Sequence, residues 1–359
     1  MRLKIDSRLQ KLRQKLTEKE IDAIFISQPE NRCYLSGFNG SAGFLLITEQ
    51  RAILATDFRY IEQVRTQASD YEVFRITNAM ANWFPELIAG FDLKKLGVET
   101  EHITFAMYRQ LNDILKEQHS PLKLVPAEGL VESLRAVKEP GEIEFITKAA
   151  EISDGAFNYI ESIIDTGMSE QEIAWEIEKC LHERGSHGIP FDIIVASGPN
   201  SALPHAKSSE RIINIGEPVV IDMGARFEGY SSDLTRTICL GPPDETFKKV
   251  YDIVLGAQLT AIAIVKEGMT GDQADSLART VIRETNYGEA FGHGLGHGIG
   301  LATHESPRLG PGSTELLTSG MVFTIEPGIY LSGWGGVRIE DIIALDNNKA
   351  KVISKARKG

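Results

Sequence analysis

Two segments in the C-terminal half of the chain each carry a pair of acidic residues placed symmetrically about a turn. Asp222 and Asp233 flank the polar centre of VVIDMGARFEGYSSDLTRTICLG, and Glu326 and Glu340 flank the Gly-rich centre of FTIEPGIYLSGWGGVRIED. Each segment has the order strand, turn, strand that predicts a β-hairpin. Both pairs are therefore expected to be directly opposed across antiparallel strands, with Cβ atoms about 4.5–5.5 Å apart.

Directly opposed carboxylates repel each other, and one of the two pKa values rises unless a positive charge lies between them. A single acid in a strand is most often solvated, but two mirrored pairs favour a bound cation. A nearby segment, FGHGLGHGIGLATHE, holds three of the eight histidines in the chain. Four carboxylates and one imidazole suit two hard divalent cations, and the candidate ligands are Asp222, Asp233, His297, Glu326 and Glu340.

The glycines that alternate through the histidine-rich segment argue against a regular helix and for backbone packed close to another group. A dinucleotide-binding loop does not fit, because Ile299 occupies the position of the third glycine. No GKS or GKT and no HExxH occur in the chain, which excludes a P-loop and a helical zinc-protease motif.

The chain resembles the M24 metallopeptidases of the "pita-bread" fold, in the branch of Xaa-Pro aminopeptidases and Xaa-Pro dipeptidases (prolidases). The resemblance rests on VVIDMGA, SSDLTRT, LPHA, HGLGHGIG followed by HESP, FTIEPGIY and GVRIED. NRCYLSGFNGSAGFLLIT and ATDFRYIEQ resemble the N-terminal domain of the same branch, so nearly the whole chain is covered. Ala302, Thr303 and Cys33 depart from the family pattern, and none of them is a candidate ligand.

By this resemblance, one metal takes Asp222, Asp233 and Glu340, and the other takes Asp233, His297, Glu326 and Glu340. Asp233 and Glu340 would then bridge the two ions. Two metals roughly 3.5–4 Å apart can generate a hydroxide at neutral pH and polarise a scissile carbonyl. The oxygen-rich ligand set favours Mn(II), although Co(II) or Zn(II) fits the same residues.

Further residues are candidates for direct roles in catalysis. By resemblance, Glu326 also accepts the proton of the attacking water, and His205, His293 and His304 contact the substrate carbonyl, the oxyanion or the leaving amine. Arg338 lies two residues before Glu340, so strand alternation places it on the same face. Its guanidinium suits either a ligand carboxylate or the C-terminal carboxylate of a substrate. By the same alternation, the Tyr330 phenol is expected beside these groups.

The fold class expected is α+β, with two domains. Residues 1–126 alternate strand-like and helical stretches, which predicts a smaller α/β domain, and the resemblance implies the creatinase/prolidase N-terminal type. The strand-like stretches are DAIFIS, GFLLIT, RAILATD, EVFRIT and KLGVET, and the helical ones are RLQKLRQKL, FRYIEQVRTQA and FAMYRQLNDILKE. Residues 132–359 are expected to form the catalytic pita-bread domain. Within it, DTGMSEQEIAWEIEKCL at 165–181 is echoed 101 residues later at 266–282, and both copies have capping-box spacing. We therefore expect two halves related by a pseudo-twofold axis.

Composition narrows the range of partners. With 50 acidic and 38 basic residues, the formal charge of −12 argues against nucleic acid and anionic membrane. Three widely spaced cysteines without CxxC suggest neither a disulfide framework nor a structural zinc. The N-terminal segment has no apolar stretch typical of an export signal, so a cytoplasmic location is expected. A homodimer is expected by resemblance.

The function expected first is that of an Xaa-Pro aminopeptidase, which cleaves a peptide before a proline at the second position. The alternative is an Xaa-Pro dipeptidase restricted to dipeptides, and the choice depends on whether the site clamps a free carboxylate after the proline. Methionine aminopeptidases usually lack such an N-terminal domain. Creatinase-like amidinohydrolases do not use this metal set, and non-hydrolytic proteins of the fold have typically lost it, so the five ligands argue against both.

Overall fold

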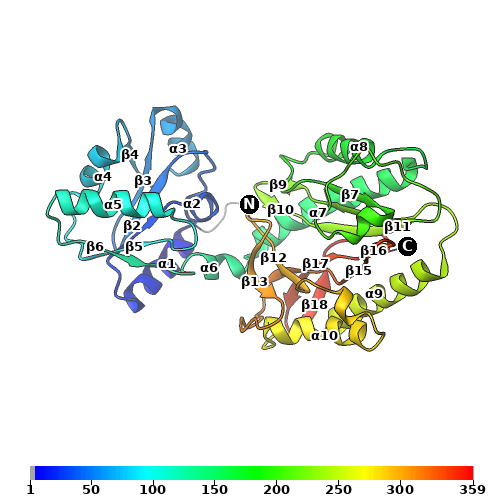
Figure 1. Cartoon of the computed structure of the whole chain (residues 1–359). Coiled ribbons are helices and arrows are strands. Elements are labelled where there is room, and N and C mark those ends of the chain that lie inside the picture. The colour runs from blue at the N-terminus through cyan, green and yellow to red at the C-terminus, as the bar shows by residue number, and fades with distance from the viewer. Residues whose placement is uncertain (1–4, 359) are drawn as a thin grey trace. The chain divides into compact units, whose positions relative to one another are not determined.

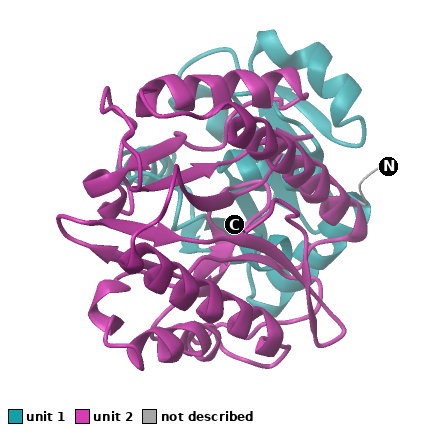
Figure 2. Ribbon diagram, turned by 90° about the vertical axis from the view of Figure 1, so that its right-hand side faces the viewer, with its two compact units in different colours: residues 1–135 teal, residues 136–359 magenta. Residues whose placement is uncertain are grey.

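The computed structural model describes residues 5–358, and its helices and strands are labelled in Figure 1. The chain divides into two compact units, Met1–Arg135 and Ala136–Gly359 (Figure 2). The expected boundaries at 126 and 132 lie slightly on the N-terminal side of this division. Over residues 5–358, no helix is both long enough and apolar enough to cross a membrane.

Unit 1 is built on one six-stranded sheet with the strand order β4-β3-β2-β1-β5-β6. The expected strands form: β1 (Ala23–Ile26), β2 (Phe44–Thr48), β3 (Ala52–Thr56), β4 (Glu72–Arg75) and β5 (Lys95–Val98). Helices α1 (Ile5–Glu18), α3 (Ile61–Gln67) and α5 (Phe105–Glu117) also match the sequence pattern. Three elements are not among those expected from the sequence pattern: α2 (Pro29–Ser36), α4 (Met80–Ile88) and β6 (Lys123–Pro126). The short helices η1 (Phe58–Tyr60) and α6 (Glu132–Ala136) complete the elements.

The first half of unit 2 packs two helices against a three-stranded sheet of order β11-β8-β7. Its apolar core joins one face of this sheet to the inner faces of both helices. The elements are α7 (Pro140–Ile163), α8 (Glu170–Glu183), β7 (Ile194–Ser197), η2 (Gly198–Ala202), β8 (Pro218–Met223), β9 (Arg226–Phe227), β10 (Tyr230–Ser231) and β11 (Leu234–Cys239).

The second half of unit 2 packs two helices against a five-stranded sheet of order β13-β12-β14-β17-β18 and a separate hairpin, β15-β16. The strands of both halves lie between the two helix pairs (Figures 1 and 2). The elements are α9 (Glu245–Ile264), α10 (Gly271–Arg283), η3 (Gly288–Ala290), β12 (Gly296–Gly298), β13 (Glu305–Leu309), β14 (Val322–Ile325), β15 (Gly328–Leu331), β16 (Gly335–Arg338), β17 (Asp341–Asp346) and β18 (Lys349–Val352).

The repeated helix start occurs in both halves, as expected. At α8 the Ser169 hydroxyl accepts from Glu172 N at 3.2 Å, and the Glu172 carboxylate accepts from Ser169 N at 2.8 Å. At α10 the Thr270 hydroxyl accepts from Gln273 N at 3.2 Å, and the Gln273 side chain accepts from Thr270 N at 3.0 Å. Each box satisfies donors of the first helical turn that would otherwise lack partners.

The register of the first hairpin corrects one prediction. Asp222 is paired with Thr235 and not with Asp233, which lies just before β11. The reason is the position of the turn: Glu228 (φ 50°) and Gly229 (φ 84°) both adopt the left-handed conformation that a two-residue hairpin turn requires. The centre of symmetry is therefore one residue later than expected. Asp233 still shares the parity of Thr235, so it lies diagonal to Asp222.

The register of the second acidic pair agrees with the prediction. Ile325 pairs with Asp341 between β14 and β17, and Gly328 pairs with Arg338 between β15 and β16. Both registers place Glu326 opposite Glu340. The residues between these strands join the β14–β17 pair to the β15–β16 hairpin. The tip of this hairpin is the Gly-rich turn between Leu331 and Gly335.

Candidate metal centre

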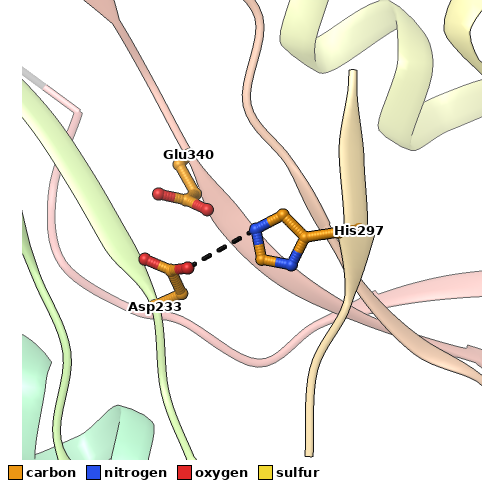
Figure 3. Close-up of side chains that lie close together, drawn as sticks. All are labelled: Asp233, His297 and Glu340. Carbon is orange, nitrogen blue, oxygen red and sulfur yellow. Dashed lines mark ion pairs between the residues drawn. The ribbon is translucent and has the colours of Figure 1, made fainter. Parts of the chain in front are cut away.

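Three candidate ligands from separate strand segments converge in unit 2. Asp233 precedes β11, His297 is in β12, and Glu340 lies between β16 and β17 (Figure 3). One ligand atom of each residue lies within 4.8 Å of those of the other two. The Asp233 carboxylate oxygen is 3.6 Å from His297 Nε2. Residues that are up to 107 positions apart in the sequence thus face one another across the two halves.

The other two candidate ligands adjoin this group. Glu326 Oε1 lies 3.4 Å from His297 Nε2, on the side contributed by the second half. The charge of Asp222 acts on Asp233, Glu326 and Glu340, and Asp222 Oδ2 accepts a hydrogen bond of 2.7 Å from Arg338. The structure therefore brings all five predicted residues to one place.

Four carboxylates in this position carry a large electrostatic cost. Burial raises the pKa of Asp233 well above its usual range, and the charges of Glu340 and Asp222 raise it further. Burial likewise raises the pKa of Glu340, and Glu326 and Asp222 add to this effect. Burial raises the pKa of Glu326 to about 7. Cations between these groups would remove the conflict.

Two further observations show that the residues fit metal ions. Within residues 5–358, Asp222 Oδ1 is buried and has no hydrogen-bond partner, as expected of an oxygen available to a cation. The Nδ1 of His297 lies 3.1 Å from the Gly298 carbonyl, which selects the tautomer with a lone pair on Nε2, the nitrogen that faces the carboxylates. Burial lowers the pKa of His297 to about 4, so the ring is neutral near pH 7.

Two threonines orient the carboxylates. Thr235 Oγ1 donates to Glu340 Oε2 at 2.7 Å, and Thr324 Oγ1 lies 3.2 Å from Glu326 Oε1. Neither threonine is among the residues predicted from the sequence. Strand alternation contained the signal, because Thr235 lies two residues after Asp233 and Thr324 lies two residues before Glu326.

Arg338 is buried and connects the candidate ligands to the surrounding polar groups. Its Nη2 donates to Asp222, while its Nη1 donates to the Tyr330 hydroxyl at 3.0 Å and to the Pro204 carbonyl at 3.3 Å. Nε donates to Thr235 Oγ1 at 3.2 Å. Of the two uses considered from sequence, these contacts favour orientation of a carboxylate over capture of a substrate.

Three histidines outside the ligand set surround the same place. His293 Nε2 is 2.9 Å from the Tyr330 hydroxyl, and burial lowers the pKa of His293 to about 4. The His304 side chain is exposed, and its ring centroid lies 4.1 Å from that of His297. His205 is exposed and within electrostatic reach of both His293 and His304.

Two models of known protein families match the chain. Residues 144–347 match the model of "Metallopeptidase family M24", and residues 8–137 match that of the "Creatinase/Prolidase N-terminal domain". The chain therefore belongs to the M24 metallopeptidases, with a creatinase-type N-terminal domain followed by the M24 domain.

Within this family the chain is similar to enzymes that act on Xaa-Pro bonds. The structure of an Xaa-Pro dipeptidase from Bacillus anthracis is 42% identical, with a TM-score of 0.94 and 99% of each chain covered. The Xaa-Pro dipeptidase of Pyrococcus furiosus is 37% identical over 98% of each chain. An X-Pro aminopeptidase structure from Thermotoga maritima is 38% identical, with a TM-score of 0.89 and 98% of each chain covered.

These similarities bear on the expected activity. They support an Xaa-Pro peptidase of the M24 family, and they favour the dipeptidase alternative over the aminopeptidase that the sequence analysis placed first. The expected homodimer and the cytoplasmic location stay predictions.

Proposed function

We propose that this protein is an Xaa-Pro dipeptidase (prolidase) that hydrolyses the bond before proline with the help of two divalent metal ions. The observation that carries the metal-dependent part is the gathering of two buried carboxylates, Asp233 and Glu340, and two partly buried ones, Asp222 and Glu326, near the neutral imidazole of His297. Similarity to Xaa-Pro dipeptidases along almost the whole chain supports the substrate class.

In this proposal Asp222, Asp233 and Glu340 hold one ion, and Asp233, His297, Glu326 and Glu340 hold the other. The oxygen-rich set favours Mn(II), with Co(II) or Zn(II) as substitutes. When bound, two such ions would polarise the scissile carbonyl and activate a water molecule at neutral pH.

The side chains of the protein would orient and protonate the reacting groups. Glu326, whose Oε1 is held by Thr324, would accept the proton of the attacking water. His304 is exposed beside His297, and His205 is exposed within electrostatic reach of His304, so both would donate to the substrate carbonyl or the leaving amine. His293 would contribute from its hydrogen bond to Tyr330. Arg338 would hold the Asp222 carboxylate in a fixed orientation through its hydrogen bond.

The test is hydrolysis, with added Mn(II), of an Xaa-Pro dipeptide, its C-terminal amide and an Xaa-Pro-Yaa tripeptide. Xaa-Ala serves as the sequence control, and a chelator serves as the metal control. A dipeptidase should cleave only the dipeptide with a free carboxylate. Cleavage of the amide and the tripeptide at comparable rates would support the Xaa-Pro aminopeptidase, which the similarity to the Thermotoga maritima enzyme keeps as the second candidate.

A further inference from the structure

Helix α10 carries an ion pair that faces the segment leading to His297. Arg279 Nε donates to Asp275 Oδ2 at 2.6 Å, and Arg279 Nη2 donates to Asp275 Oδ1 at 2.8 Å. The Asp275 side chain is 2% exposed and that of Arg279 is 16% exposed. A bidentate pair this deeply buried has a fixed geometry and a high cost if one partner is removed.

The pair uses its remaining hydrogen-bonding capacity on backbone groups of residues 291–295. Arg279 Nη1 donates to the Phe291 carbonyl at 2.8 Å, and Nη2 donates to the His293 carbonyl at 2.6 Å. Asp275 Oδ1 accepts from Leu295 N at 3.0 Å. The guanidinium also lies 4.2 Å from the centroid of the Phe291 ring. Every second residue of the segment is therefore held by this pair.

Two glycines in and beside this segment have no room for a side chain. A Cβ at Gly294 would lie 2.8 Å from the Leu309 carbonyl oxygen, and one at Gly296 would lie 2.1 Å from the Thr324 carbonyl oxygen. These positions therefore require glycine, which has the greatest conformational freedom of any residue. The buried side chains of Phe291 and Leu295 anchor this backbone, and Asp275 and Arg279 add the hydrogen bonds that fix its polar groups.

Both ends of the segment reach the candidate metal centre. At one end, the His293 ring bonds to the Tyr330 hydroxyl, and its carbonyl is bound by Arg279. At the other end, the Leu295 carbonyl accepts from Glu326 N at 2.8 Å. Leu295 thus links Asp275, through its backbone N–H, to the backbone of Glu326, through its carbonyl.

We propose that Asp275 and Arg279 are a positioning pair for the reaction, which sets the placement of His293 and of the Glu326 backbone. The inference rests on the proposed function. The pair touches neither substrate nor metal, and it acts through the backbone of residues 291–295. Arginine is required because one planar fork serves a carboxylate and two carbonyls at once, whereas lysine has a single nitrogen.

The test compares Arg279→Met and Arg279→Lys with Arg283→Met, which makes the same change at an exposed position one turn later on α10. In the Mn(II)-loaded protein, Arg279→Met should lower kcat for an Xaa-Pro dipeptide roughly 10–100-fold, the cost typical of losing a partner that orients a metal site. KM should stay within about twofold of wild type. Arg279→Lys should recover only part of kcat, and Arg283→Met should match wild type.

Amide hydrogen exchange in the metal-free protein provides a readout independent of activity. Arg279→Met should speed exchange in peptides that cover residues 291–296, because the Leu295 amide loses its ordered acceptor. A folded Arg279→Met variant with wild-type kcat and unchanged exchange there would overturn the inference. So would a loss of thermal stability without a change in kcat, since that outcome would mean a purely structural pair.

Asp275→Asn keeps the shape of the side chain and decides the question by the same two measurements if Arg279→Met does not fold. Faster exchange in residues 291–296 together with a lower kcat would support the pair, and wild-type values of both would overturn it. If the wild-type protein cleaves no Xaa-Pro substrate, the proposed function fails. If amide exchange in the variants is unchanged, the positioning role of Asp275 and Arg279 fails.

Discussion

The two halves of unit 2 begin their second helices alike, but they hold the segments that carry the candidate histidines differently. In the first half Glu170, the first residue of α8, is fully buried and accepts hydrogen bonds from Ser197, Asn200 and Ser209. In the second half the equivalent position is Gly271, where a Cβ would lie 2.0 Å from the Arg308 carbonyl oxygen. The second half therefore anchors its segment one turn later, through Asp275 and Arg279.

The comparison teaches that a repeated start signal does not imply repeated contacts. Glu170 ties together the two ends of the loop that carries His205, since its carboxylate bonds to both the nitrogen and the hydroxyl of Ser197 and of Ser209. Asp275 and Arg279 tie down the segment that carries His293. Each half thus orders one histidine beside the candidate metals, by a device that its own packing permits.

The largest expected effect concerns a ligand from each half. Asp233→Asn and Glu340→Gln should each abolish activity, because each removes a proposed bridging charge from both metals. The loss of activity should exceed the roughly 10–100-fold that is typical when a residue hydrogen-bonded to a metal ligand is removed. Turnover and metal content per chain are the measurements. Near-normal turnover with two metals bound would refute the dinuclear proposal, and tolerance of only one substitution would show that the halves contribute unequally.

Glu170→Ala should be the most destabilising change in the first half. It leaves several buried donors without an acceptor, at a cost of about 3 kcal/mol or more in the free energy of unfolding. Urea unfolding of the metal-free protein measures this. Gln171→Ala, an exposed change at the next position of the same helix, should cost little. If the two variants unfold alike, Glu170 is not the anchor of the His205 loop.

The pH dependence of metal binding should show which groups must lose protons. Burial raises the pKa of Glu326 to about 7 and raises those of Asp233 and Glu340, so these acids hold protons that metal binding must release. The affinity for Mn(II) should therefore fall as the pH drops below 7, by about tenfold per unit for each proton released. His297, with a pKa of about 4, is neutral there and adds nothing.

Calorimetric titration of Mn(II) in buffers of different ionisation enthalpy counts the released protons directly. Protons should be taken up by the buffer near and below pH 7. An affinity independent of pH between about pH 6 and pH 8 would show that the carboxylates are already ionised before metal binds.

Removal of a capping hydroxyl should have the smallest effect, and the effect on the free energy of unfolding should be equal in the two halves. Ser169→Ala and Thr270→Ala each remove the hydroxyl of a capping box, and each should lower the free energy of unfolding by about 1 kcal/mol. Urea unfolding compares them, with kcat as a check that the site is intact. A difference much larger than the error would mean that the equivalence of the two helix starts does not extend to their energetics.

The parts of the fold that the sequence predicted are those governed by local patterns. The strands of unit 1, the two capping boxes and the opposition of Glu326 to Glu340 follow from alternation and symmetry. The predicted partner of Asp222 was wrong by two residues, because the turn position depends on backbone torsions at Glu228 and Gly229. Helix α4 was missed, and its sequence MANWFPELI contains an internal proline that argues against a helix.

The candidate site was predictable where ligand chemistry marks a residue and unpredictable where tertiary packing does. His297 and the four acids stand out as metal-binding residue types in a symmetric pattern. Glu170, Asp275 and Arg279 are ordinary residues of amphipathic helices, and only the folded chain shows that their charges are buried. Arg338 was predictable in part. The alternation of side chains along its strand predicted that it faces the site, but only the structure shows that its partner is Asp222.

The division of the ligands between the halves has a consequence for assembly. Asp222 and Asp233 belong to the first half, and the remaining three candidate ligands belong to the second. The halves also meet directly, because Glu340 N donates to the Thr235 carbonyl. A chain cut between β11 and α9 would yield two fragments, each with an incomplete coordination set. Bound metal ions would then act as a cross-link that stabilises the reassociated fragments. The amount of metal bound would therefore report the fraction of fragments that have reassociated.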